Sequence, residues 1–212
     1  MIILFNGPPG SGKDFAADYF KEKGFKHLSF KYQLYKETIK YFNVDHDWFM
    51  ERYNDRTTKE VPTYQLGNMS CREAMIYVSE KRIKPRKGLD YFGKQVANEI
   101  DLSKNYAISD GGFIDELVPV VEKVGTDNFV LVQITRDGHD FSSDSRRYFQ
   151  GKDVELELVN GRPTKIDSKY VLPRTFDVKT YRVHNNHTLE SFRDSLSTIH
   201  KLENKYSVGE HA

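Results

Sequence analysis

Residues 7–14 read GPPGSGKD, and their types and spacing are suited to binding a phosphate group. They fit the pattern G-x-x-x-x-G-K, in which backbone N–H groups surround a phosphate and the following helix adds its positive N-terminus. Lys13 would then reach the β- and γ-phosphates of a nucleoside triphosphate. We therefore predict a nucleotide-binding loop with contacts from Gly7, Gly10, Ser11, Gly12, Lys13 and Asp14.

The alternative interpretation is a glycine-rich turn without a ligand, but this does not explain why Gly7, Gly12 and Lys13 fall at the required spacing. Asp14 is the one irregularity, because a serine or threonine is usual after the lysine. An anionic side chain at this position is suited to holding Mg²⁺ or its water molecules.

The elements that must position this loop alternate between strands and helices. The apolar run Ile2–Asn6 precedes the loop and a helical pattern over 13–23 follows it, which is the required order. Further strands are predicted at 27–30, 106–110, 129–134 and 181–185, and further helices at 32–42, 70–81, 91–100, 113–124 and 189–203. This alternation predicts an α/β fold in three layers, with a five-stranded parallel sheet between helices.

Two regions depart from the alternation, and we expect the chain, 1–212, to form one domain around them. In the region 31–90, the residues that follow the predicted helix at 32–42 are also helical in pattern and are rich in arginine and lysine. The region 137–175 contains Val154–Val159 and 162–166 around Asn160-Gly161, which predicts a β-hairpin with a two-residue turn. The tail, 204–212, has little apolar content and is expected to fray.

Polar residues stand where the predicted strands end. Ligands gather at the carboxyl ends of parallel strands, so we expect Asp110, Arg136 and Asn185 to converge on the loop. Asp110 is suited to contacting Mg²⁺ directly or through water; its alternative role is the N-cap of the next helix. Asp115 and Glu116 lie in the first turn of that helix, where acidic residues favour the dipole, and we interpret them as structural.

Arginine side chains occur in two clusters, one within 31–90 and one in or next to 137–175. Phosphoryl transfer spreads negative charge over the moving group, and the planar fork of arginine neutralises it. A helix beginning near Arg146 would aim Arg146 and Arg147 at the mouth of the site. The alternative for each is a solvated surface charge. The candidates are Arg72, Arg82 and Arg86 in the first cluster and Arg136, Arg146 and Arg147 in the second, with Lys36 as a further cation.

The composition limits the classes of partner. The net charge is +1, so no overall field favours nucleic acid or an anionic membrane, and we expect neither as a partner. The single cysteine rules out an internal disulfide and is typical of a reducing compartment. No apolar run is long enough for a membrane span. We therefore expect a cytoplasmic protein that binds small molecules.

Several motifs together resemble one family, the phage-type deoxynucleoside monophosphate kinases. The ending Gly12-Lys13-Asp14 is similar to the phosphate loop of these enzymes and of animal phosphomevalonate kinases. The segment SDGGFIDE at 109–116 resembles their strand-end S-D-x-R-F-x-x-E, and VHNNHTLE at 183–190 resembles V-I-x-N-x-G-[ST]-L-E. The segment from 69–73 to 90–92 resembles the helices on their monophosphate side.

The resemblance implies a kinase of the P-loop NTPase type that uses ATP and Mg²⁺ to convert a nucleoside monophosphate to the diphosphate. ATP would lie on the loop, with Asn185 near the adenine and Arg136 at the base of a lid formed by 137–175. The monophosphate would lie against 31–90. Residues implied in its binding are Lys36, Arg72, Arg82, Arg86 and Asp110, those in catalysis Lys13, Arg136, Arg146 and Arg147, and those at the metal Asp14 and Asp110.

Some features differ from the family pattern and leave alternatives open. Gly112 replaces the family arginine and so removes one phosphate or substrate contact, and His187 replaces a turn glycine. The hairpin lengthens the lid and offers a contact for a homodimer. One alternative is a kinase for another phosphorylated metabolite, such as a phosphomevalonate-like acceptor; another is a nucleotide-dependent switch. If the chain is phage-encoded, its location is the host cytoplasm.

Overall fold

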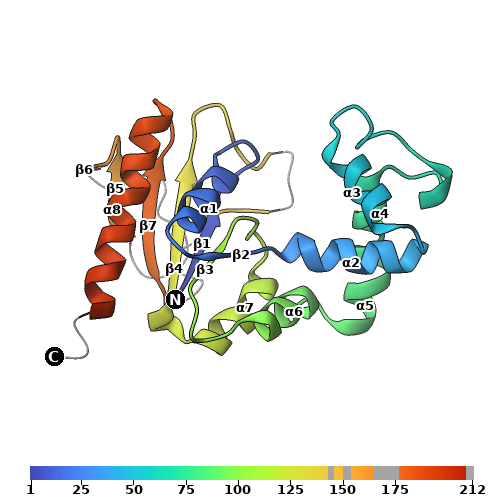
Figure 1. Ribbon diagram of the computed structural model, residues 1–212, viewed down its shortest axis with the longest axis horizontal. Coiled ribbons are helices and arrows are strands. Elements are labelled where there is room, and N and C mark those ends of the chain that lie inside the picture. The colour runs from blue at the N-terminus through green and yellow to red at the C-terminus, as the bar shows by residue number, and fades with distance from the viewer. Residues whose placement is uncertain (143–145, 150–153, 165–176, 209–212) are drawn as a thin grey trace.

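A mostly parallel sheet forms the centre of the fold, in a computed structural model that describes residues 1–142, 146–149, 154–164 and 177–208 (Figure 1). Its neighbouring strands follow the order β2-β3-β1-β4-β7-β5-β6, and β6 alone runs antiparallel to its neighbour. The strands are β1 (Ile2–Asn6), β2 (Lys26–Leu28), β3 (Tyr106–Ile108), β4 (Phe129–Thr135), β5 (Val154–Val159), β6 (Arg162–Thr164) and β7 (Lys179–His184).

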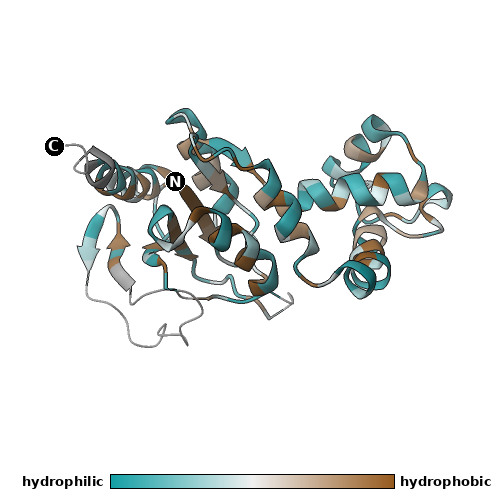
Figure 2. Cartoon of the chain, turned by 90° about the horizontal axis from the view of Figure 1, so that it is seen from below, coloured by the Kyte–Doolittle hydropathy of each residue, from teal (hydrophilic) through white to brown (hydrophobic). Residues whose placement is uncertain are grey.

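Helices cover both faces of this sheet, as the sequence predicts. Ile3 and Phe5 of β1 pack with α1 and α8, whereas Ile2 and Leu4 pack with α6 and α7 on the opposite face. Every residue of β1 is buried, and Figure 2 shows the strand at the N-terminus as strongly hydrophobic. The helices are α1 (Lys13–Glu22), α2 (Phe30–Phe42), α3 (His46–Asn54), α4 (Cys71–Tyr77), α5 (Lys84–Lys87), α6 (Tyr91–Glu99), α7 (Ile114–Val124) and α8 (Leu189–Val208).

The predicted five-stranded sheet is wrong, because the β-hairpin adds two strands to it. The hairpin itself is confirmed, and its turn residues Asn160 and Gly161 have positive φ angles of 53° and 72°, as a primed turn requires. However, β5 pairs in parallel with β7 and buries Leu158 in the main core. The hairpin therefore belongs to the sheet and not to a lid. Residues 165 and 166 of the predicted hairpin lie outside the described residues, as does much of the predicted lid.

The helical region between β2 and β3 forms a lobe beside the sheet, with a core of its own (Figure 1). That core includes Phe49, Leu66 and Cys71. Ser70 caps α4 through a reciprocal capping box with Glu73, and the helix continues without a break into a π-helical turn, η2 (Val78–Ile83), and then α5. The remaining short helices are the 3₁₀ turns η1 (Tyr64–Leu66) and η3 (Thr126–Asn128).

Helix ends differ from the sequence prediction in two places that matter. Helix α2 begins at Phe30, two residues earlier than predicted, which brings its N-terminus to the end of β3. Helix α8 continues to Val208, beyond the predicted helix end at residue 203; residues 209–212 lie outside the described residues. Among the residues that the structure describes, no helix is long and apolar enough to cross a membrane.

Candidate functional site

The loop between β1 and α1 turns sharply through glycines with positive φ angles. Gly10 and Gly12 have φ angles of 77° and 108°, in the left-handed region that favours glycine. Among the described residues, the N–H groups of Gly10 and Gly12 donate no hydrogen bond, so they are available to a ligand at the start of α1. The Lys13 ammonium donates to Pro8 O at 2.6 Å, and the Ser11 hydroxyl is buried without a partner among the described residues.

Side chains from the ends of β4 and β7 hold this loop. Arg136 Nη1 donates to Gly10 O and Asn185 Nδ2 donates to Ser11 O, both at 2.8 Å. The structure thus brings Arg136 and Asn185 to the loop; their roles toward ATP stay predictions. His139 was not expected from the sequence: its ring occupies the space that a Cβ at Gly10 would need.

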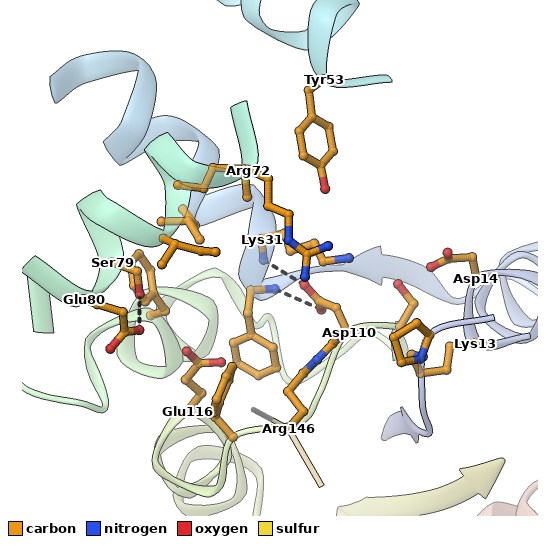
Figure 3. Close-up of a pocket in the computed structure, with 18 of the residues that line it drawn as sticks. Lys13, Asp14, Lys31, Tyr53, Arg72, Ser79, Glu80, Asp110, Glu116 and Arg146 are labelled. Carbon is orange, nitrogen blue, oxygen red and sulfur yellow. Dashed lines mark hydrogen bonds between the residues drawn. The ribbon is translucent and has the colours of Figure 1, made fainter. Parts of the chain in front are cut away.

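A cavity of about 830 Å³ opens beside the loop and reaches into the helical lobe (Figure 3). Such a volume accommodates a nucleotide-sized ligand. Its cations come from distant parts of the chain and include Lys13, Lys31, Lys59, Arg72, Lys84 and Arg146. Its acids are Asp14, Glu80, Asp110 and Glu116, and its apolar wall includes Phe30, Leu34, Tyr53, Met75, Ile76, Phe92 and Phe113.

Asp110 caps a helix, but a different helix from the one predicted. Its carboxylate accepts hydrogen bonds from Phe30 N at 3.1 Å, Lys31 N at 2.8 Å and the Ser29 hydroxyl at 2.8 Å. It therefore fixes the N-terminus of α2 against β3, and three donors already occupy it. In the described part of the chain, no group of three or more histidine, cysteine or acidic residues is placed to hold a metal.

Only some of the sequence-predicted cations line the cavity. Arg72 does, because Arg72, Met75, Ile76 and Ser79 follow the i, i+3, i+4, i+7 spacing of one helix face. Arg82 does not: its guanidinium donates to the Tyr41 hydroxyl and packs against the rings of Tyr41 and Tyr77.

Three more predicted cations lie away from the cavity. Lys36 forms an ion pair with Glu99 at 3.2 Å. It follows the cavity-lining Lys31 by five residues and therefore lies on a different face of the helix. Arg86, on the short helix α5, is exposed. Arg147 is exposed and does not line the cavity, and residues 146–149 do not begin a helix, so the expectation that Arg146 and Arg147 point together is wrong.

Arg146 reaches the cavity because Asn6 holds its segment. Asn6, at the end of β1, donates to Arg147 O at 3.0 Å and accepts from Phe149 N at 3.1 Å. Gln133 adds a bond to Phe149 O at 3.0 Å. These bonds press the Arg146 side chain against Gly112: a Cβ at Gly112 would lie 2.4 Å from Arg146 Cδ.

Glu116 differs most from its sequence interpretation as a structural residue. It is not only an acidic residue of a first helical turn, because it is 6% exposed and lines the cavity. Burial raises its pKa to about 8, although the nearby Lys84 ammonium opposes the shift. With its pKa raised to about 8, the Glu116 carboxyl group mainly retains its proton at neutral pH. Other lining residues that sequence reasoning missed include Tyr53, Ser79, Glu80, Lys84, Phe92 and Phe113.

We expect Glu116→Gln to stabilise the fold increasingly as the pH rises from about 4.5 to about 8. Over this range the unfolded wild type has lost the Glu116 proton while the folded wild type retains it, so raising the pH favours unfolding. Glutamine cannot ionise, and the expected gain reaches about 4 kcal/mol at pH 8 and is constant above it. Urea unfolding at several pH values measures the gain.

The matched control is Asp115→Asn, on the exposed side of the same helical turn. Its difference from the wild type should show no comparable rise with pH. If Glu116→Gln and Asp115→Asn had the same pH profile, the conclusion that the folded protein keeps Glu116 protonated would be contradicted.

A second cavity of about 570 Å³ adjoins the first and shares Asp14, Lys31, Tyr53, Lys59, Ser109 and Asp110 with it. Tyr35 and Tyr32 line this second cavity. Four other aromatic residues of the helical lobe line neither cavity, namely Tyr41, Phe42, Trp48 and Phe49.

Comparison with known proteins adds no assignment to this geometry. No protein-family model matches the chain, and no curated protein is similar to it in sequence. The function must therefore be argued from the cavity and the loop themselves.

Proposed function

We propose that the protein transfers the γ-phosphoryl group of ATP to a deoxynucleoside or nucleoside 5′-monophosphate and so forms the diphosphate. The observation that carries this proposal is that the glycine-rich loop and cations from three parts of the chain line the same cavity. Lys13 comes from the loop, Arg72 from the helical lobe and Arg146 from the segment after β4. A donor and an acceptor that both carry phosphate require such a concentration of positive charge.

The reaction needs little covalent chemistry from the protein. The acceptor phosphate is already an anion, so no general base is required, and catalysis consists of alignment and charge neutralisation. Lys13 would contact the β- and γ-phosphate oxygens, and Arg72 would hold the acceptor phosphate. Arg146 would neutralise the group in transfer. Arg136, bonded to Gly10 O, keeps the loop in shape and acts as a positioning residue.

The donor set also suits Mg²⁺. Asp14 is exposed and lines the cavity beside Lys13, and Mg²⁺ commonly binds one or two carboxylates together with substrate phosphates. The Asp110 carboxylate already accepts three hydrogen bonds, so Asp14 is the better candidate ligand. When bound, the ion supplies positive charge to the phosphate oxygens.

The proposal is tested by an acceptor screen at saturating ATP and Mg²⁺, following ADP release. We expect at least one deoxynucleoside monophosphate to stimulate ADP release far above the rate with ATP alone. Phosphomevalonate serves as the comparison acceptor. Turnover of phosphomevalonate without turnover of any nucleoside monophosphate would replace this proposal by its closest alternative.

A further inference from the structure

The cavity changes character along its length. Figure 3 shows Lys13 and Asp14 at one end and Ser79, Glu80 and Glu116 at the other. Between the two ends lie Lys31, Arg72, Asp110 and Arg146 (Figure 3). A nucleoside monophosphate has the same polarity, with a charged phosphate at one end and a neutral hydrogen-bonding base at the other. The end around Glu116 is therefore the end that suits a base.

Glu116 is buried there without a hydrogen-bond partner. Its side chain is 8% exposed and forms no hydrogen bond among the described residues, and its carboxyl oxygens keep some accessible surface, because Glu116 lines the cavity. Its nearest cation is Lys84, whose ammonium lies 4.0 Å from Glu116 Oε1. A buried carboxyl without hydrogen bonds is costly to the fold, and a ligand that donates to it would remove the cost.

The neighbours of Glu116 provide one donor, a second acceptor and flat apolar surface. The Lys84 ammonium pairs with Glu80 at 2.8 Å and lies 4.6 Å from the centre of the Phe113 ring. Partial burial disfavours the charged form of Glu80, but the hydrogen bond and charge of Lys84 outweigh this and lower its pKa. The rings of Phe92 and Phe113 line the same cavity and can pack against a planar base.

We propose that this end of the cavity selects guanine: the Glu116 carboxyl group releases its proton to solvent when the base binds and accepts hydrogen bonds from the N1–H and 2-amino groups, while Lys84 donates to O6. Glu80 orients Lys84 and offers a further acceptor for the 2-amino group. The inference rests on the proposed function, because it assumes that the acceptor is a nucleoside monophosphate.

Among the four common bases, guanine fits this set of groups best. Its pairing edge has one acceptor beside two N–H donor groups, which complements one ammonium and two carboxyl groups. Cytosine and thymine each present two acceptors and one donor group, so one acceptor would face a carboxylate. Adenine presents one donor group and one acceptor and would leave one carboxyl group without a donor. A site built on buried polar groups discriminates strongly, because a wrong ligand leaves those groups unpaired.

The test compares kcat/KM for dGMP, dIMP, dAMP, dTMP and dCMP in the wild type and in Glu116→Gln. dIMP lacks only the 2-amino group of guanine. In the wild type we expect dGMP to exceed dIMP by about 10-fold and the other three by about 100-fold. In Glu116→Gln we expect the dGMP value to fall by about 100-fold and the dGMP-to-dIMP ratio to approach one, with KM for ATP unchanged.

Asp115→Asn is the matched control and should keep the wild-type dGMP-to-dIMP ratio. Calorimetric titration with dGMP and dIMP, without ATP, reads the same preference independently of turnover. Preference for another base, or an unchanged ratio in Glu116→Gln, would overturn the inference and leave the kinase proposal standing. Tight, Glu116-dependent binding of dGMP with no turnover of any nucleotide would support the guanine site and overturn the kinase proposal.

Discussion

Lys13→Ala is expected to lower kcat/KM for phosphoryl transfer by about 1,000-fold, which corresponds to about 4 kcal/mol of lost transition-state stabilisation. Lys13 lies at the start of α1, and its ammonium donates to Pro8 O at 2.6 Å inside the loop. On binding, that short side chain contact would give way to the phosphate oxygens, whose negative charge develops during transfer. A continuous assay for ADP, with the acceptor varied, gives the value.

Lys21→Ala is the control for this prediction, because Lys21 is an exposed lysine at the other end of the same helix. It should keep its activity within about twofold of the wild type, since an exposed charge far from the loop contributes little. Circular dichroism and thermal unfolding check that Lys13→Ala keeps the fold. A folded Lys13→Ala variant that is as active as Lys21→Ala would exclude the loop as the phosphate site.

Arg146→Ala is expected to lower kcat by about 1,000-fold, in the range found for arginines that neutralise a transferring phosphoryl group. Arg147→Ala should change kcat by less than about threefold, because the Arg147 side chain is exposed and lies outside the cavity. The two neighbouring residues thus form a matched pair. Rapid-quench measurement of a single turnover separates transfer from product release.

Gly112→Ala should act through Arg146. A Cβ at Gly112 would lie 2.4, 2.6 and 2.8 Å from Arg146 Cδ, Cγ and Cβ, and these atoms near the backbone cannot simply swing away. We expect kcat to fall by about 10-fold to 100-fold in the wild-type background and by clearly less when Arg146 is already alanine, which keeps only the Cβ contact. Equal effects in the two backgrounds would show that Gly112 does not make room for Arg146.

The parts of the molecule encoded by local pattern were predictable from the sequence. The apolar run of β1, the glycine-rich loop and α1 are contiguous, so their order alone indicates how they lie. Arg136 and Asn185 reach the loop because strand ends in a parallel sheet share one edge.

The composition of the cavity depends on contacts between distant segments, which single-sequence pattern does not contain. Arg72 and Arg82 look alike in the sequence, yet only Arg72 lies on the helix face toward the cavity. Glu116 resembles an ordinary acidic residue of a first helical turn, and its burial arises only when α7 packs beside α6 and the helical lobe. The hairpin signal at Asn160 fixes the turn but not which strand accepts β5.

The most direct test of the central claim is the fate of the γ-phosphate of ATP. The protein is incubated with Mg²⁺, γ-³²P-labelled ATP and one deoxynucleoside monophosphate at a time, and the products are separated by chromatography. The account predicts that label appears as the β-phosphate of a deoxynucleoside diphosphate, first with dGMP, and that Lys13→Ala slows its formation by about 1,000-fold. Label released only as inorganic phosphate, at a rate that no acceptor changes, would contradict the account and identify a nucleotide-hydrolysing switch instead.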